Sequence, residues 1–304
     1  MKHKGYIILF ILSLVSISSF AQQESQYTQY MYNTITVNPA YAGSRGLLSF
    51  NGLYRAQWIG LEGAPETINF SANTPLGYSN VGLGLSFTSD KIGPSVESLG
   101  TADFSYTIQT SYRTKLSFGL KAGFSSINVD LSKLNAEHAN DPVLTDVNRI
   151  APVVGAGVYF HSDKWYVGLS SPNFIETDHY DDVKVSTATE QAHFYLIGGY
   201  VFELNQNLKF KPAALVKAAV GAPLAVDASA SFMFDEKLTL GLAYRWDAAV
   251  SALVGFQISD QLMLGYAYDY DTTELGNYNS GSHEIFLRFE LFSKVRRTVN
   301  PRFF

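Results

Sequence analysis

Apolar and polar residues alternate along most of this chain with a period of two. Val81, Leu83, Leu85 and Phe87, for example, are separated by glycine and serine. A period of two places successive side chains on opposite faces of a β-strand. The pattern predicts about fourteen strands of the length that crosses a bilayer. They cover residues 48–58, 67–73, 81–88, 101–108, 116–124, 154–160, 165–169, 194–202, 208–218, 224–232, 238–246, 250–258, 262–270 and 285–291.

The charged residues of these segments fall between the apolar positions, and therefore on one face. A basic residue facing lipid at mid-depth costs about 2–4 kcal/mol, so the charged face of a membrane barrel is the lumen. We therefore predict an all-β fold, a transmembrane antiparallel barrel of about fourteen strands. A soluble sandwich or barrel also alternates, with the faces exchanged, and alternation alone does not exclude it. The predicted lumenal charges are Arg55, Asp103, Lys121, Lys209, Lys211, Lys217, Asp227, Arg245, Asp269, Glu284, Arg288 and Glu290.

The connections between strands support the membrane interpretation. Short polar turns alternate with a second set of connections, most of which are longer, such as 130–150 and 172–191. Outer-membrane barrels have short periplasmic turns, longer outside loops and an even strand count, which places both termini in the periplasm. The barrel is expected over residues 47–292. Pro212 has no N–H to donate to a neighbouring strand, so we expect a bulge or interrupted pairing there.

The amino terminus has the layout of a secretory signal peptide. Lys2 and Lys4 precede the apolar residues 6–15, and Ser19-Phe20-Ala21 places small residues at a cleavage site. The apolar stretch is too short for a transmembrane anchor. We expect a signal peptide over residues 1–21, export, and location in the outer membrane.

Composition narrows the function further. The chain has no cysteine, 14% aromatic and 16% charged residues, and a net charge of −5. Without cysteine there is neither a disulfide framework nor a lipidated terminal cysteine. The scattered basic residues give no indication of nucleic-acid binding.

Residues 22–46 are too aromatic for a free tail in water. Tyr27, Tyr30, Met31, Tyr32 and Tyr41 all lie in this segment. One hypothesis is that the segment, beginning in the periplasm, packs into the lumen or against a partner, and the other is a plain periplasmic strap. The inward-facing glycines allow strand curvature, or a smooth lumen that admits another chain. These glycines are Gly82, Gly84, Gly119, Gly123, Gly241 and Gly265.

Residues 293–304 do not continue the last strand. Arg296 and Arg297 are adjacent, so one of them would face lipid, and Pro301 cannot join a ladder. We expect a periplasmic tail whose basic side chains meet lipid phosphates or an acidic partner. The closing Phe304 is similar to the terminal aromatic by which outer-membrane barrels are recognised for assembly.

Three stretches resemble the PorP/SprF family of the type IX secretion system. They are QYTQYMYNTITVNPAYAGSRG at 26–46, YRAQWIGLEGAPETINFSANTPL at 54–76 and GYAYDYDTTELGNYNSGSHEIFLRF at 265–289. The resemblance implies an outer-membrane component that assists secretion or display of a large surface protein, such as a gliding adhesin. It would bind the C-terminal domain of that cargo or link to the periplasmic machinery. Its expected partners are the cargo, other secretion-system proteins and lipid. The partner-binding candidates are Tyr27, Tyr30, Tyr32, Asn38, Pro39, Tyr41, Arg296, Arg297 and Phe304.

Candidate chemistry is sparse. The stretch ETDHYDD at 176–182 is rich in oxygen ligands, but its spacing matches no calcium loop. Asp269, Asp271 and His283 would form a site near the outside rim only if the fold brings them together. We expect no enzyme, no metal and no cofactor. The alternative function is a general porin or small-solute channel, which would need an open lumen.

Overall fold

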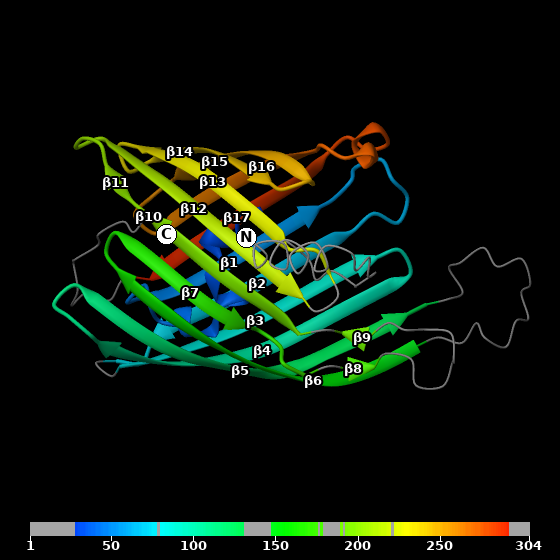
Figure 1. Cartoon of the computed structure of the whole chain (residues 1–304), viewed down its shortest axis with the longest axis horizontal. Coiled ribbons are helices and arrows are strands. Elements are labelled where there is room, and N and C mark those ends of the chain that lie inside the picture. The colour runs from blue at the N-terminus through cyan, green and yellow to red at the C-terminus, as the bar shows by residue number, and fades with distance from the viewer. Residues whose placement is uncertain are drawn as a thin grey trace, which may run out of the picture.

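The protein is a closed barrel of 14 antiparallel strands, which confirms the predicted fold (Figure 1). The computed structural model describes residues 28–77, 80–130, 147–175, 177–178, 189–190, 192–219 and 222–291. Neighbours in the barrel are consecutive in the chain, and the first and last strands, β1 and β17, pair to close it. The strands are β1 (Leu48–Ala56), β2 (Glu66–Pro75), β3 (Val81–Ile92), β4 (Ser95–Gln109), β5 (Thr114–Val129), β6 (Val147–Ser162), β7 (Trp165–Ser171), β10 (His193–Tyr200) with its short continuation β11 (Phe202–Glu203), β12 (Leu208–Ala219), β13 (Ala225–Phe234), β14 (Leu238–Arg245), β15 (Ala249–Gln257), β16 (Leu262–Asp271) and β17 (Ser282–Leu291).

The two ends of the barrel differ in their connections. Short turns gather at the left of Figure 1 and the longer loops at the right. Strand β1 starts and strand β17 ends at the turn end. By the rule for outer-membrane barrels, the turn end is periplasmic and the loop end faces outside.

The wall is higher on one side than the alternation predicts. Strands β4, β5 and β6 have 15, 16 and 16 residues, whereas β14 has 8. At about 3.3 Å per residue and a tilt of about 40°, the long strands reach roughly 35–40 Å along the barrel axis, beyond an apolar band of about 25 Å. Alternation is lost where a strand leaves the hydrocarbon. For this reason the alternation did not reveal residues 147–150 as strand. They were expected in a loop, but they pair with β5 as the start of β6.

The outer surface is apolar and the interior is polar, as a membrane barrel requires. Leu85, Leu120 and Leu242 are exposed on the outer face, while Asn51, Asn69 and similar polar side chains are buried. Most of the predicted lumenal charges are also buried. Aromatic side chains are exposed on the outer face towards both ends of the strands, which is the girdle arrangement of membrane barrels. These are Tyr54, Tyr244, Trp246 and Tyr270 towards the loops, and Tyr106, Phe160, Phe202, Phe234 and Phe256 towards the turns.

Pro212 interrupts pairing on one side of its strand, as expected. The β12 to β13 register runs through Pro212 opposite Ala230 without a break. On the other side, the β10 pairing ends at Ala213 and resumes with β11 at Phe210. The carbonyl of Leu208 accepts from Leu204 N, so alternate residues, including Pro212, direct their backbone towards β10 and β11. The missing N–H therefore faces the interruption.

Other elements in the described residues are short. The two-residue strands β8 (Thr177–Asp178) and β9 (Thr189–Glu190) pair antiparallel within the connection 172–191. The helices are η1 (Tyr30–Tyr32), α2 (Thr34–Val37), η2 (Pro39–Tyr41) and η4 (Glu274–Asn277). In the part of the chain that is described, no helix has the length and apolar character to cross a membrane.

Candidate functional site

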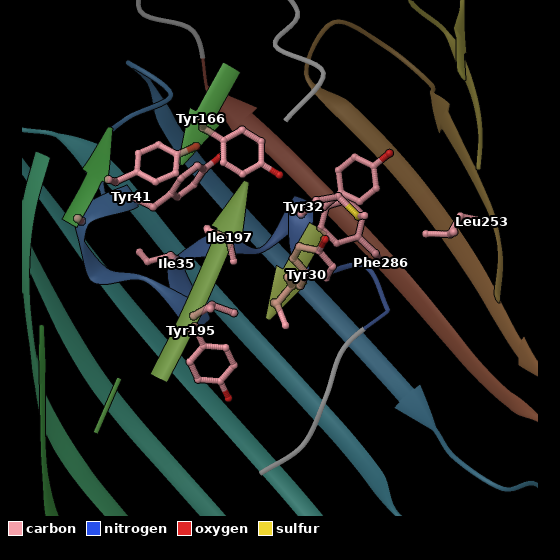
Figure 2. Close-up of a cluster of buried hydrophobic side chains, with 14 of the residues drawn as sticks. Tyr30, Tyr32, Ile35, Tyr41, Tyr166, Tyr195, Ile197, Leu253 and Phe286 are labelled. Carbon is pink, nitrogen blue, oxygen red and sulfur yellow. The ribbon is translucent and has the colours of Figure 1, made fainter. Parts of the chain in front are cut away.

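Residues 28–46, which we call the plug, lie inside the barrel. Figure 2 shows Tyr30, Tyr32, Ile35 and Tyr41 among side chains of the barrel wall. Ile35 is 0% exposed, and these residues belong to the main cluster of buried apolar side chains. The wall contributes Tyr159, Tyr166, Tyr195, Ile197, Leu253 and Phe286 to the cluster. The hydrophobic core of this protein therefore sits in the lumen, between plug and wall.

The plug crosses the lumen from the loop end to the turn end. Thr28 contacts Glu284 and Asp269, which lie close to the loop ends of β17 and β16. Gly43 N donates to Asn73 Oδ1, at 3.2 Å, close to the turn end of β2. Thr28 therefore lies near the loop end, and the carboxyl end of the plug, which leads into β1, lies at the turn end. The expected start of the segment in the periplasm falls on residues 22–27, which lie outside the described residues.

A buried ionic cluster, which we call the clasp, holds the amino end of the plug. It consists of Arg55, Asp269 and Glu284. Arg55 Nη1 lies 2.7 Å from Asp269 Oδ2 and 3.1 Å from Glu284 Oε2, and the three side chains are at most 2% exposed. One cation faces two carboxylates, so the clasp alone carries a net negative charge.

Donors from the plug offset this excess. The backbone N–H groups of Thr28 and Gln29 donate to the two oxygens of Glu284, at 3.0 and 2.8 Å. The Thr28 hydroxyl donates to Asp269 Oδ2, at 2.6 Å, and accepts from Arg55 Nη1, at 3.0 Å. Buried charges are tolerated only when they are paired and hydrogen-bonded. The clasp therefore needs the plug to complete the hydrogen bonds of its buried charged groups.

The Asn-Pro-Ala-Tyr-Ala-Gly stretch at 38–43 forms a tight turn against the wall. Asn38 Oδ1 accepts from Ala40 N and caps η2, while its Nδ2 donates to the carbonyl of Val158, both at 3.0 Å. Pro39 occupies the first helical position, where its fixed φ fits and no donor is lost. Gly43 has φ +70°, and a Cβ there would lie 2.9 Å from the Cα of Gly82. Glycine at 43 is thus required by both conformation and space.

Lumenal glycines make room for the plug. A Cβ at Gly119 would lie 2.1 Å from Ala40 N, and one at Gly157 would lie 2.2 Å from Asn38 Oδ1. Added carbons at Gly82, Gly84 and Gly265 would meet Ala42, Ile35 and Gln29. Gly123 and Gly241 instead face neighbouring strands. Of the two interpretations of these glycines, close approach of a chain therefore applies to four of them, Gly82, Gly84, Gly119 and Gly265. The approaching chain is the protein's own plug.

Polar wall residues satisfy the backbone of the plug. Ser105 and Ser170 donate to the carbonyls of Ala42 and Val37, at 2.7 and 2.9 Å. Lys121 Nζ pairs with Asp103 at 2.8 Å and lies 3.5 Å from the carbonyl of Ile35. The plug has little regular structure, so its carbonyls need these partners in a site without bulk water.

Cationic residues surround Tyr32 and the carboxyl end of the plug. Lys211 Nζ and the Arg288 guanidinium lie 5.4 and 5.8 Å from the centre of the Tyr32 ring. Arg45, at the end of the plug, forms an ion pair with Glu290 of β17. The ion pair therefore holds the carboxyl end of the plug, and cation–π contacts hold Tyr32, both by different means from the clasp.

The structure places the predicted partner-binding residues in two groups. Tyr30, Tyr32, Asn38, Pro39 and Tyr41 are buried in the lumen and contact the wall. Tyr27, Arg296, Arg297 and Phe304 lie outside the described residues, as do the expected signal peptide 1–21 and the expected tail 293–304.

The site residues that the sequence did not single out are those of the clasp. The sequence assigns Arg55 and Glu284 only to the lumenal face, and it considers Asp269 also for a rim site with Asp271 and His283. They come from the second and third of the quoted stretches, and Thr28 and Gln29 come from the first. The three stretches therefore meet at one place in the barrel. The sequence does contain one signal for the clasp, which is the presence of two acidic residues and one basic residue at inward-facing positions of separate motifs.

The fold does not assemble the chemical sites considered from the sequence. His283 contacts Tyr266 on the outer face, with 2.6 Å between Tyr266 Oη and His283 Nδ1, whereas Asp269 points into the lumen. Strand alternation separates the two side chains. Within the described residues, no group of three or more His, Asp or Glu is arranged to hold a metal. Most of 176–182 lies outside the described residues.

Comparison with known proteins identifies the family. The family model described as type IX secretion system membrane protein PorP/SprF matches residues 19–289. The chain belongs to the PorP/SprF family. This PorP/SprF protein is accordingly an outer-membrane barrel component of the type IX secretion system, and it associates with other components of that system.

Solved structures support the fold of the PorP/SprF protein. Omp33, an outer membrane protein of Acinetobacter baumannii, matches with a TM-score of 0.50 and 8% identity over 81% of this chain and 98% of its own. A TodX deltaS2S3 mutant, a monoaromatic hydrocarbon channel, matches with a TM-score of 0.50 and 11% identity over 91% of this chain and 97% of its own. At these identities the likeness is one of fold alone. No curated protein matches the sequence.

Proposed function

We propose that this PorP/SprF protein is a plugged docking barrel that assists secretion or surface display of a large cell-surface protein. It binds the C-terminal domain of that cargo, which is a protein such as a gliding adhesin, or it links the outer membrane to the periplasmic machinery. The observation that carries the proposal is the occupied lumen. Tyr30, Tyr32, Ile35 and Tyr41 fill the space that a transported chain would need.

A plugged barrel offers partners its rims and loops. The high wall of β4, β5 and β6 provides strand surface beyond the apolar band, and Tyr112 and Tyr278 are exposed at the turn and loop ends. On the periplasmic side, the tail 293–304 contributes Arg296, Arg297 and Phe304 as candidate contacts. Basic and aromatic side chains are typical of protein interfaces and lipid headgroup contacts.

The second candidate function is a small-solute channel, because the neighbours with the same fold include a channel. A general porin has an open lumen lined by charge rings. In the described part of this barrel the buried charges pair with one another at the clasp and at Lys121–Asp103. The packing of the plug therefore favours docking over conduction.

The deciding experiment is affinity purification of the tagged protein from native outer membranes in mild detergent, with mass spectrometry of the proteins that accompany it. We expect a large secreted protein or periplasmic secretion components. The matched variant carries Arg296→Ala and Arg297→Ala, which keep the closing Phe304, and should lose the periplasmic components while retaining a surface cargo. A barrel that purifies alone, and conducts steadily in a planar bilayer, would replace docking by the channel function.

A further inference from the structure

Two loops at the loop end of the barrel form one ordered surface, which we call the platform. It consists of residues 57–65, between β1 and β2, and residues 272–281, between β16 and β17 (Figure 1). Ile59 N donates to the carbonyl of Gly281 at 2.9 Å, and Ser280 N donates to the carbonyl of Ile59 at 2.8 Å. Such a reciprocal pair of backbone hydrogen bonds joins neighbouring strands, and here it joins the two loops.

The platform is also fixed to the turns on either side of it. Gly93 N, in the turn between β3 and β4, donates to the carbonyl of Gly63 at 2.9 Å. Thr272 N donates to the carbonyl of Ala248, in the turn between β14 and β15, also at 2.9 Å. Binding by a loop costs free energy when the loop must first be ordered. The hydrogen bonds of the platform reduce that cost, so the platform is a preorganised surface.

Two apolar side chains of the platform are exposed. Tyr278 is 74% exposed and Ile59 is 40% exposed. Both lie in loops beyond the ends of the strands, so neither belongs to the lipid-facing side of a strand. Exposed tyrosines on a rigid surface are frequent energetic centres of protein interfaces. The platform therefore has the apolar anchors of a docking surface.

Every charged residue of the platform and its flanks is acidic. Residues 57–66, 246–248 and 271–281 contain no lysine or arginine. Within the described residues, none of their five carboxylates forms an ion pair. They are Glu62 and Glu274 in the platform, Glu66 and Asp271 at the adjoining strand ends, and Asp247 in the turn that contains Ala248.

The turns at the opposite end of the barrel mix both signs of charge. Acids and bases stand side by side there, as at Asp163–Lys164 and Glu236–Lys237. The uniform charge therefore belongs to the platform side and not to the chain as a whole. A partner that covers the platform has to supply positive charge, because burying unpaired carboxylates is costly. Anionic lipid headgroups, in contrast, are repelled by the same acids.

We propose that the platform is the docking surface for a lysine- or arginine-rich segment of a protein at the cell surface. The cations of that segment pair with Glu62 and Glu274, and its side chains cover Tyr278 and Ile59. A cation over the Tyr278 ring adds to the attraction. The inference rests on the proposed docking function and assigns the surface that the cargo contacts.

The first test uses the purified full-length protein in detergent and a fluorescent synthetic peptide of alternating lysine and tyrosine. Glu62→Gln with Glu274→Gln should weaken binding of the peptide about tenfold, because two charges of the platform are lost. The matched control is Asp235→Asn with Asp260→Asn, which removes the same net charge in turns at the opposite end and should change binding less than about twofold. All four side chains are exposed, so neither pair of substitutions disturbs the core.

Two results of this titration would overturn the proposal. One is equal weakening by the two pairs of substitutions, because binding would then follow net charge alone. The other is the absence of binding to the unmodified protein.

The second test separates this inference from the proposed function. The tagged unmodified protein and the variant Glu62→Lys with Glu274→Lys are purified from native outer membranes in mild detergent. We expect the variant to keep the periplasmic components and to carry at least about tenfold less of the surface protein, because two attractive charges become repulsive. Surface protein at the unmodified level would overturn the platform and leave the docking function intact. A failure of the docking function looks different, because the unmodified protein then carries no surface protein, and the peptide titration still decides for or against the platform.

Discussion

At the scale of single residues, the plug depends on lumenal glycines, because it fills the space that a larger side chain would take. Gly119 is the clearest case, because a Cβ there would lie 2.1 Å from backbone atoms of Ala40. Backbone gives way less easily than the end of a flexible side chain. Gly52 has nothing within 4 Å of the same added carbon. The alternation of the strands places Gly119, and not Gly52, on the inward face, and only the fold shows that a residue of the plug lies opposite it.

Gly119→Ala should lower the free energy of unfolding by about 1–3 kcal/mol, the usual cost of overpacking. The matched control, Gly52→Ala, should change it by no more than about 0.5 kcal/mol, as expected for an unobstructed site. Urea titration of folding into lipid vesicles measures both. Equal stability of the two variants would show that the plug does not pack against β5.

The clasp gives a second prediction at this scale. Glu284→Gln removes one carboxylate from a buried ionic cluster and weakens its hydrogen bonds to Thr28 and Gln29. We expect a loss of about 1–3 kcal/mol, because the Gln amide leaves one of the two buried N–H groups of Thr28 and Gln29 without an acceptor, whereas Arg55 stays paired with Asp269. Glu203→Gln breaks the exposed pair with Lys164, at 3.2 Å, and should cost less than about 1 kcal/mol. If both variants unfolded at the same urea concentration, the clasp would not be a major anchor.

At the scale of elements, the plug and the wall are separate parts with different requirements. The strands satisfy their backbone groups with one another around the closed barrel. The plug has only short helices and uses wall serines, asparagines and charges as partners. A barrel can therefore close without the plug, but its polar lumen would then be filled by water.

Removing residues 22–46 while keeping residues 1–21 should convert a silent barrel into a conducting one. The intact protein should show no steady conductance in a planar bilayer, and the deletion should show stable steps. Deletion of residues 293–301 is the control, because it leaves both the plug and the closing Phe304 in the chain. Steady conductance by the intact protein would mean that the plug leaves the lumen or does not seal it.

At the scale of the whole molecule, the outer surface is the surface for lipid. Leu242 lies at mid-strand in β14 and is 64% exposed, whereas Tyr112 is 90% exposed in the turn between β4 and β5. Exposed leucines on many strands would cause aggregation in water. In a bilayer the same side chains make the contact with hydrocarbon that a membrane barrel requires. The inverted arrangement of a soluble barrel is excluded by this outer face.

Leu242→Arg should reduce folding stability in lipid vesicles by about 2–4 kcal/mol, the cost of arginine near the bilayer midplane. Tyr112→Arg should cost about 0–1 kcal/mol, since the interface tolerates charge. Both are measured by the same urea titration. An equal effect at the two positions would indicate that Leu242 is not at mid-depth.

The sequence by itself determines the barrel, because the period of two and the placement of charge are local properties of each strand. Arg55, Lys121 and Asp269 could be assigned to the lumen, and Pro212 to an interrupted pairing, without a structure. Alternation could not find the extra residues of β4, β5 and β6, because a strand beyond the membrane no longer needs one apolar face. It also could not choose between a plug and a strap for residues 22–46, since aromatic content reveals burial but not its location.

Tertiary structure decided what fills the barrel and how the chain runs through it. The clasp joins Thr28 to Asp269 and Glu284, which lie more than 200 positions away in the chain. No local pattern encodes such a contact, because it depends on the closure of β1 on β17. The direction of the plug follows from the same contact. The sequence settles which residues face lipid and which face the lumen, whereas only the closed barrel settles which lumenal groups meet.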